Sequence, residues 1–253
     1  MTGLSANPSS AFESARADGL ARFRLDANTL HLWFCHRDTG MSSNAFCRAA
    51  LSRHAPVAPR SWRFATGEHG KPRLVRAPLP LDFNLSHSGD WMVCAVSAGT
   101  PVGVDIELDN SSRNVMRLSR RFFSPAETAD IEALPEDARR ERFYDYWTLK
   151  EATVKAFGGA LGPALGKAAF RLSYSSESDC GRIFPAGDAG QTVAQHYLVR
   201  VGGGLAAYSL ALCVAGVSAV PMAFRVHTLP DGGPGQTPAL TVRASSGIGD
   251  FPN

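Results

Sequence analysis

The chain has 253 residues, 44% of them hydrophobic, which is enough for one large domain or two small domains with cores of their own. Its formal net charge is +3, from 26 Lys and Arg against 23 Asp and Glu, and no basic run or stripe indicates a nucleic acid partner. Its five cysteines are widely spaced and lack a CxxC pair, which argues against a disulfide framework or a zinc knuckle. The sequence has no recognisable signal peptide and no apolar run approaching about 18 residues, so we expect a cytoplasmic protein with no membrane association.

Composition divides the chain into a leader, a folded region and a tail. Residues 1–25 are polar and lack a clear period, and residues 217–253 hold many Gly and Pro residues, so we expect a loose leader and a flexible tail. The first half of the folded region contains, in chain order, a predicted strand at Leu30–Cys35, a helix at Asn44–His54, and strands at Trp62–Thr66, Trp91–Ser97 and Pro101–Leu108.

The second half of the folded region begins with helices. Ser124 followed by Pro125, with Glu127 three residues after the serine, is typical of a helix N-terminus. A long helix is predicted at Arg139–Phe157, where two glycines end it, and strands are predicted at Phe170–Ser173, Gln195–Val201 and Ala207–Val214. We therefore predict an α+β fold with two subdomains, at 26–104 and 105–216.

Two acidic residues alternate with apolar ones in the segment Gly103–Leu108. On a strand, Asp105 and Glu107 share one face while Val104 and Ile106 point to the other. Two carboxylates on one face repel each other unless a cation lies between them, and Mg²⁺ commonly takes one or two carboxylates together with substrate phosphates. The alternative is a half-exposed strand whose polar face happens to be acidic, and this pair alone does not decide between the two.

The long helix carries Trp147, Glu151 and Lys155 at a spacing of four residues, so they lie along one face. Glu151 there would serve as a third metal ligand or a proton acceptor, and Lys155 would hold a phosphate, with Lys150 as a further cation nearby. The alternative is an ordinary surface Glu–Lys pair, which stabilises a helix by a few tenths of a kcal/mol.

The segment Gly70–Gly89 combines cations with short hydrogen-bond donors. Lys71 and Arg73 flank Pro72 in a turn, and the cluster Ser86–Ser88 stands just before a predicted strand. Hydroxyl, imidazole and backbone N–H groups of this kind bind phosphate. The alternatives are a surface turn at Gly-Lys-Pro and a structural role for His87.

In this order the motifs resemble the surfactin-synthetase-type 4′-phosphopantetheinyl transferase family. The matching blocks are Gly70-Lys71-Pro72, FNLSHSGDW (83–91), GVDIE (103–107), RRFFSPAE (120–127) and FYDYWTLKEATVKAFGGAL (143–161). The resemblance covers roughly residues 62–175. It implies the family's fold, two pseudo-two-fold-related α+β subdomains in one chain, with coenzyme A in the cleft between them.

The resemblance also implies roles for individual residues. It implies metal ligands at Asp105, Glu107 and Glu151, and catalytic roles for Glu151 and Lys155. It implies coenzyme A contacts at Lys71, Pro72, Arg73, Asn84, Ser86, His87 and Lys155. The stretch that follows Lys155, into the glycines and from Leu161 onward, resembles the part that meets the carrier protein.

The activity implied is the Mg²⁺-dependent transfer of the 4′-phosphopantetheine group of coenzyme A to a serine of an apo acyl, peptidyl or aryl carrier protein, with release of 3′,5′-ADP. The family resemblance further implies a monomer. The N-terminal segment, where relatives hold the 3′-phosphate, is shorter than is usual in the family, and Arg48 or Arg53 would substitute. Two alternatives remain: a weakened relative that binds carrier protein or coenzyme A without efficient turnover, and an unrelated Mg²⁺-dependent phosphodiesterase.

Overall fold

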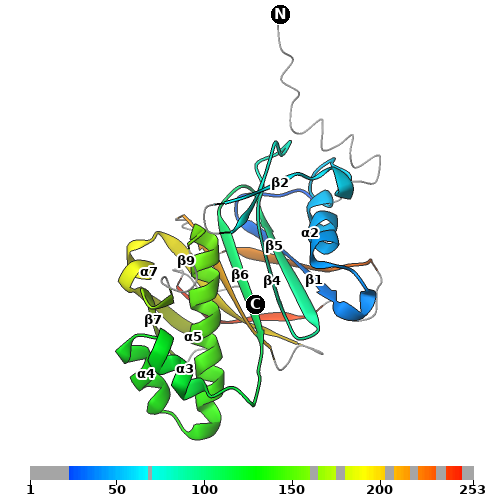
Figure 1. Cartoon of the computed structure of the whole chain (residues 1–253). Coiled ribbons are helices and arrows are strands. Elements are labelled where there is room, and N and C mark those ends of the chain that lie inside the picture. The colour runs from blue at the N-terminus through cyan, green and yellow to red at the C-terminus, as the bar shows by residue number, and fades with distance from the viewer. Residues whose placement is uncertain are drawn as a thin grey trace, which may run out of the picture.

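The computed structural model describes residues 23–67, 70–159, 165–174, 180–202, 208–216, 222–231 and 238–246. Two sheets lie side by side, each covered by helices, and the predicted α+β class is confirmed (Figure 1). Within these residues, no helix combines the length and apolar character needed to cross a bilayer.

The first sheet has the strand order β11-β1-β5-β4. Its strands are β1 (Thr29–His36), β4 (Asp82–Ser88), β5 (Trp91–Ser97) and β11 (Ala223–Thr228). Helix α2 (Ser43–Ser52) buries Phe46, Ala50 and Leu51 against this sheet. A separate hairpin of β2 (Phe64–Thr66) and β3 (Pro72–Leu74) follows α2, and short 3-10 turns occur at Arg37–Thr39 and Pro59–Ser61.

The second sheet has the order β6-β10-β9-β12-β8-β7. Its strands are β6 (Val102–Leu108), β7 (Ala168–Ser173), β8 (Gly181–Ala186), β9 (Ala194–Val201), β10 (Tyr208–Ala215) and β12 (Leu240–Ser245). The helices of this half are α3 (Val115–Phe122), α4 (Pro125–Glu132), α5 (Glu136–Phe157) and α7 (Gly187–Gln191). The predicted capping box at Ser124 and Glu127 is present, and Gly158 ends α5 in the left-handed conformation at φ 68°.

The two halves repeat one order of elements. In the first half, a strand (β1) is followed by a helix and then by the antiparallel pair β4 and β5, and β5 returns to pair with β1. In the second half, β6 is followed by helices and later by the antiparallel pair β9 and β10, and β10 returns to pair with β6. This repetition agrees with two related subdomains. Their sheets share one apolar core, to which β1, β5, β6, β9 and β10 all contribute.

The expected division of the chain needs two corrections. The boundary placed between residues 104 and 105 falls inside β6, and all of β6 pairs with β10 of the second sheet. The flexible tail predicted at 217–253 is wrong where the structure describes it, because β11 pairs with β1 and β12 pairs with both β9 and β8. Of the predicted leader, residues 1–22 lie outside the described residues. Phe23 and Leu25 pack against the core between α2 and the first sheet.

An ion-pair network joins β12 to the long helix. The guanidinium of Arg243 donates to Asp145 at 2.9 Å and lies 2.7 Å from Glu141, while the Tyr174 hydroxyl donates to Asp145 at 3.1 Å. Asp145 is buried, and burial is the main reason that its pKa rises to about 6 despite the neighbouring Arg243. The C-terminal strand is therefore held by side chains as well as by its sheet.

Candidate active site

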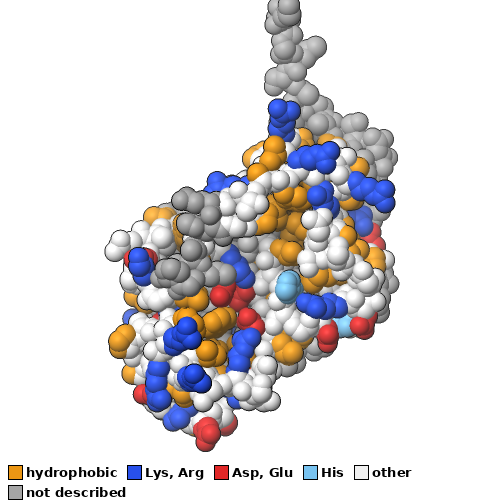
Figure 2. Space-filling model, viewed as in Figure 1, with side chains coloured by type: hydrophobic (Ala, Val, Ile, Leu, Met, Phe, Trp, Pro, Cys, Tyr) orange, Lys and Arg blue, Asp and Glu red, His pale blue; other side chains and the backbone are white. Residues whose placement is uncertain are grey.

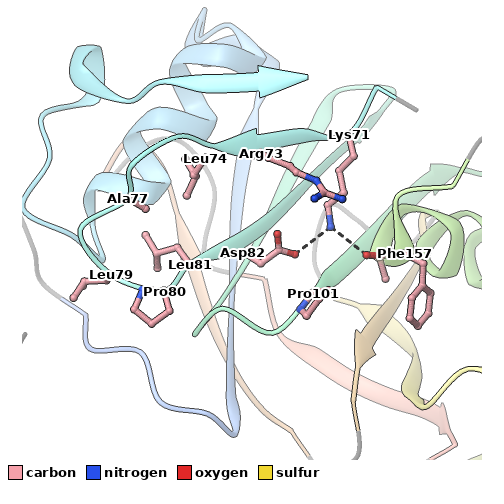
Figure 3. A pocket seen from close by; sticks show the side chains of 11 residues that line it. Lys71, Arg73, Leu74, Ala77, Leu79, Pro80, Leu81, Asp82, Pro101 and Phe157 are labelled. Carbon is pink, nitrogen blue, oxygen red and sulfur yellow. Dashed lines mark hydrogen bonds and ion pairs between the residues drawn. The ribbon is translucent and has the colours of Figure 1, made fainter. Parts of the chain in front are cut away.

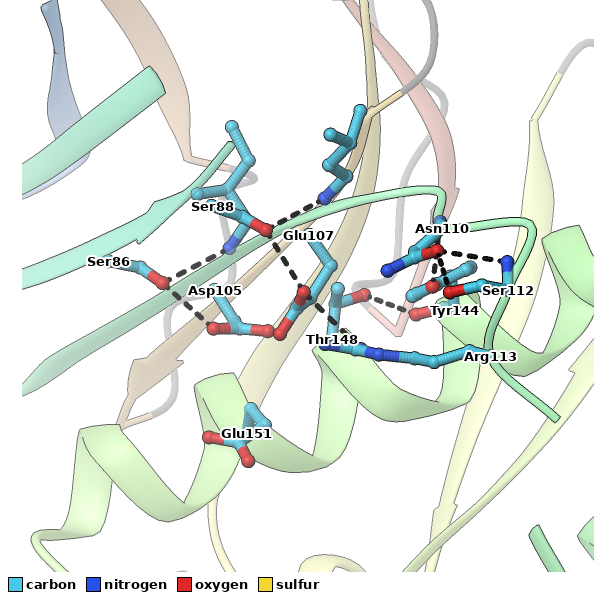
Figure 4. A network of polar contacts seen from close by, with 12 residues as sticks. Ser86, Ser88, Asp105, Glu107, Asn110, Ser112, Arg113, Tyr144, Thr148 and Glu151 are labelled. Atoms are coloured by element: carbon cyan, nitrogen blue, oxygen red, sulfur yellow. Dashed lines mark hydrogen bonds and ion pairs between the residues drawn. The ribbon is translucent and has the colours of Figure 1, made fainter. Parts of the chain in front are cut away.

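The three predicted acidic residues meet where α5 crosses β6. Gly103 permits the close approach, because a Cβ there would collide with the carbonyl oxygen of Ala152 on α5. Asp105 and Glu107 point from β6 toward the helix, and Glu151 comes from α5 (Figure 4). Figure 2 shows acidic side chains gathered near the middle of the face, with Lys or Arg side chains beside them.

Lys155 provides the positive charge in this group. Its Nζ donates to Asp105 Oδ1 at 2.6 Å and to the Ser86 hydroxyl at 3.3 Å, and it lies 3.7 Å from Glu151 Oε2. The side chain of Asp105 is 4% exposed and that of Glu151 is 12% exposed. The single ammonium group of Lys155 therefore lies close to several carboxylates that are largely buried.

Burial raises the pKa values of all three carboxyl groups, and repulsion from neighbouring carboxylates adds to it for Glu107 and Glu151. Burial is the larger cause for Glu151, and repulsion by Asp105 adds to it, so that the pKa of Glu151 reaches about 7 although Lys155 lowers it. Burial raises the pKa of Asp105 against the opposing effect of Lys155, and burial with repulsion from Asp105 raises the pKa of Glu107. Burial is thus the larger cause in all three groups, and each is easier to protonate than an exposed carboxyl group.

One carboxylate oxygen of this cluster lacks a partner. Asp105 Oδ2 is buried and accepts no hydrogen bond from any residue that the structure describes. A buried carboxylate oxygen left open among three acids fits a hard divalent cation, which binds oxygen ligands. Across the described residues, no group of three or more His, Cys, Asp or Glu side chains is arranged to hold a metal ion. A cation here would therefore take further ligands from a substrate, as Mg²⁺ does with phosphates.

Serine hydroxyls and an arginine surround the first two acids. Ser86 donates to Asp105 Oδ1 at 2.9 Å, and Ser88 donates to Glu107 Oε2 at 3.1 Å. The guanidinium of Arg113 lies 3.6 Å from Glu107 Oε2. Figure 4 shows these contacts converging on the two β6 carboxylates from β4 and from the segment after β6.

Comparison with known proteins identifies the segment that carries this cluster. Residues 101–213 match the family model described as the 4′-phosphopantetheinyl transferase superfamily. This segment is therefore similar to members of that superfamily. The match includes β6 and α5, and so all three acids and Lys155.

Curated relatives of the superfamily agree with this assignment. A 4′-phosphopantetheinyl transferase of Bacillus subtilis is 36% identical over 49% of this chain and 54% of its own length. The B. subtilis transferase Sfp is 32% identical over 57% of this chain and 64% of its own length, and the Escherichia coli transferase AcpT is 44% identical over 53% and 66%. The predicted resemblance to surfactin-synthetase-type transferases is thereby confirmed. The chain spans between half and two thirds of the length of these relatives.

The predicted coenzyme A contacts do not all lie at the acidic cluster. Ser86 does, since it touches both Asp105 and Lys155. Lys71 lies near the other end of β6, where its Nζ donates to Asp82, to Val102 O and to Ala156 O at 3.0–3.3 Å.

A cavity of about 470 Å³ adjoins Lys71. Arg73 and the half-exposed ring of Phe157 also line it, and Figure 3 shows the Lys71 ammonium pointing to Asp82 and to the end of α5. Pro72 is exposed on β3 beside these residues. This part of the predicted set therefore forms a second group, separate from the carboxylates.

Two further predicted contacts lie on β4. Asn84 is buried, and its side-chain oxygen accepts a hydrogen bond from Val104 N at 2.9 Å. His87 is exposed, and its Nδ1 lies 3.5 Å from the guanidinium of Arg37. Arg37 has no motif around it, so the sequence alone did not single it out. Its position next to His87 comes from the antiparallel β1–β5–β4 arrangement.

Three other cations have structural partners. Arg48 donates to the carbonyls of Pro59 and Trp62, and Arg53 pairs with Asp231 at 2.7 Å. These are the two arginines that the family resemblance led us to expect at the 3′-phosphate of coenzyme A. Lys150, expected near the site, points away from it and is completely buried beside Glu127.

Proposed function

We propose that the protein transfers the 4′-phosphopantetheine group of coenzyme A to a serine hydroxyl of an apo carrier protein, and that it acts as a monomer in the cytoplasm. The observation that carries the proposal is the crowded cluster of Asp105, Glu107, Glu151 and Lys155 within the segment that matches the transferase superfamily. The confirmed resemblance supports the reaction type, and the open oxygen of Asp105 supports a divalent cation.

The reaction would break one bond of the coenzyme A pyrophosphate. The carrier serine oxygen attacks the β-phosphorus, a phosphodiester forms between serine and pantetheine, and 3′,5′-ADP leaves with the bridging oxygen. Bound Mg²⁺ would neutralise the charge that develops on the pyrophosphate oxygens. Asp105, Glu107 and Glu151 are the residues proposed to hold it.

We further propose that Lys155 binds the reacting phosphate and that Glu151 accepts a proton there. The Lys155 ammonium now lies against Asp105, and a neighbouring pyrophosphate would compete for its donors. Glu151, on the same face of α5, would accept the proton of the attacking serine, either directly or through one water.

Further cations would bind the rest of coenzyme A. Lys71 and Arg73 line the cavity beside the end of α5, and His87 lies next to Arg37 on the other side of the cluster. We propose that Arg37 and His87 supply positive charge to a coenzyme phosphate. Asn84, being buried against Val104 N, would act by holding β6 in place.

The test is the mass of an apo carrier protein after incubation with the chain, coenzyme A and MgCl₂. The expected result is the gain of one phosphopantetheine group, located by peptide mapping to a serine. An unchanged carrier mass in the presence of well-folded protein contradicts the proposal and favours a relative that binds without turnover.

A further inference from the structure

The two halves of the molecule meet at an unusual seam between β4 and β6. These strands belong to different sheets, yet the hydrogen bonds between them show that they run in the same direction at a constant offset. Every second residue of β4 directs a side-chain oxygen to a backbone N–H of β6, at distances of 2.7, 2.9, 3.4 and 3.0 Å. The four acceptor and donor pairs are Asp82 with Val102, Asn84 with Val104, Ser86 with Ile106, and Ser88 with Leu108.

Side chains here take the place of the carbonyl groups of a neighbouring strand. Each buried N–H of β6 that faces β4 obtains an acceptor, which a buried donor requires. The seam therefore fixes the register of β6 against the first half. It also brings β4 side chains close to the acidic side chains of β6.

The two serines of the seam make a second contact that the other two residues do not make. Ser86 accepts from Ile106 N and donates to Asp105 Oδ1, one residue earlier. Ser88 accepts from Leu108 N and donates to Glu107 Oε2, again one residue earlier. The same local geometry thus occurs twice along the strand.

A hydroxyl has one proton and two acceptor positions. Because the backbone N–H of β6 occupies an acceptor position of each serine, the hydroxyl proton is left to point at the carboxylate. The Ser86 oxygen also accepts from Lys155 Nζ at 3.3 Å, so all its hydrogen-bonding capacity is used. Each hydroxyl therefore has one well-defined orientation.

We propose that Ser86 and Ser88 are positioning residues that fix the Asp105 and Glu107 carboxylates for a divalent cation. The inference rests on the proposed function for the identity of the ion. Each serine engages one oxygen of its carboxylate, and at Asp105 the other oxygen, Oδ2, is the one left open. Arg113 holds Glu107 from the opposite direction. Partners that orient metal ligands in this way commonly change metal affinity 10-fold to 100-fold when they are removed.

Ser88 offers the cleaner test, because it is only partly buried. Among the described residues, its hydroxyl contacts Glu107 and Leu108 N rather than Lys155 or Asp105. The experiment titrates MnCl₂ into the full chain with saturating coenzyme A and measures free Mn²⁺ by electron paramagnetic resonance. Ser88→Ala is expected to weaken Mn²⁺ binding about 10-fold. In the transfer assay, the MgCl₂ concentration for half-maximal rate should rise by a similar factor, and excess MgCl₂ should recover most of the rate.

Two control variants separate positioning from simple loss of stability. Ser88→Thr keeps the hydroxyl and should bind Mn²⁺ within about twofold of the wild type, as expected if the hydroxyl is what matters. Ser97→Ala removes a buried hydroxyl on β5 that donates to Thr100 O, far along the seam from Glu107, and should lower the unfolding midpoint while leaving Mn²⁺ affinity unchanged. If Ser88→Ala does not fold, Ser88→Cys, which keeps the size and only a weak donor, replaces it.

The outcomes distinguish the inference from the proposed function. Equal Mn²⁺ affinity in the wild type and in folded Ser88→Ala overturns the inference, whether or not transfer occurs. Weaker Mn²⁺ binding in Ser88→Ala, with recovery in Ser88→Thr, supports it even if the wild type leaves the carrier unmodified, a result that would contradict only the proposed function. A wild type that binds no Mn²⁺ overturns the inference.

Discussion

Helix α5 supplies the lysines of two lysine–carboxylate pairs, and the pairs differ in how completely their polar atoms are satisfied. Lys150 pairs with Glu127 at 2.9 Å, and both side chains are fully buried. Lys150 also donates to the carbonyls of Leu165 and Ala168, and Glu127 accepts from Ser124 N and Phe170 N. Every polar group of this pair has a protein partner.

The pair of Lys155 and Asp105 is not fully satisfied by protein partners. We therefore call it the open pair, and the pair of Lys150 and Glu127 the closed pair. Asp105 Oδ2 has no partner in the described part of the chain, and the carboxylates of Glu151 and Glu107 also interact with the same ammonium group. A closed buried network makes a protein rigid, whereas an unsatisfied one is a strained arrangement that a ligand can relieve. We propose that the lysine whose carboxylate partner keeps an unpartnered oxygen among the described residues marks the site, although both lysines belong to the same motif.

The largest expected effect is the loss of transfer when the open pair is altered. Glu151→Gln keeps the size of the side chain but removes a carboxylate proposed both to bind the cation and to accept the serine proton. The rate of carrier modification should fall by about 10²–10⁴-fold. The rate is measured by mass spectrometry of the carrier, with circular dichroism as the check on folding. A Glu151→Gln variant with the wild-type rate would remove this residue from the mechanism.

Altering the closed pair should reduce stability instead. Lys150→Met leaves Glu127 buried without its cation, which should lower the free energy of unfolding by about 3–5 kcal/mol. Urea unfolding followed by tryptophan fluorescence measures this. The double variant Lys150→Met with Glu127→Leu is the control, since removing both charges should recover much of the loss. Full wild-type stability in Lys150→Met would show that the pair is not the closed network described above.

A divalent cation should stabilise the protein through the open pair only. With coenzyme A present, MgCl₂ at about 100 times its dissociation constant should add about 2.7 kcal/mol to the free energy of unfolding. Asp105→Asn should abolish the increase, and Lys150→Met, measured under conditions where it folds, should retain it. An increase of the same size in Asp105→Asn would place the cation elsewhere.

Buried neutral histidines should make stability depend on pH. His54 accepts from Trp33 Nε1 and has its Nδ1 3.2 Å from Phe23 O, and burial, with repulsion from His31, lowers its pKa to about 3. His196 is likewise buried, and its pKa falls to about 4. The unfolded chain takes up a proton near pH 6.5 while the folded chain does so only near pH 3–4, so acid favours unfolding across this window.

Each such histidine should cost about 1.4 kcal/mol of stability per pH unit below 6.5, until its folded pKa is reached. Urea unfolding from pH 7.5 to pH 5 measures the slope. His54→Gln should reduce the slope by one proton. An unchanged slope in this variant would contradict the neutral, hydrogen-bonded state of His54.

The sequence predicted the carboxylate side of the site because that side depends on local periodicity. Alternation along β6 places Asp105 and Glu107 on one face, and a spacing of four residues places Glu151 and Lys155 together on α5. The same helical period puts Lys150 about 140° around the helix from Lys155. This difference explains why the two lysines face different surroundings.

The β4–β6 seam is not predictable in the same way. It joins strands of different sheets through side chains, and its register depends on how the two halves pack. The polar residues of β4 alternate along the strand, from Asp82 to Ser88, with the period expected of a strand. Because such groups bind phosphate, Ser86–Ser88 is instead interpreted from the sequence as a cluster of short donors before a strand. Arg37 reaches His87 only through sheet order.

The error about the tail has a different cause. The Gly and Pro residues between the last strands dominate its composition, although β11 and β12 each alternate apolar and polar side chains. Pairing with strands from both halves, together with the contact between Arg243 and Asp145, stabilises β12 in a way that composition does not reveal.

The most direct test of the account compares carrier modification by the wild type and Glu151→Gln in one experiment with coenzyme A and MgCl₂. The account predicts that the wild type adds one phosphopantetheine group to a carrier serine and that folded Glu151→Gln adds almost none. An unmodified carrier with the wild type, or equal modification by both proteins, would contradict the claim that the open carboxylate cluster is the active site.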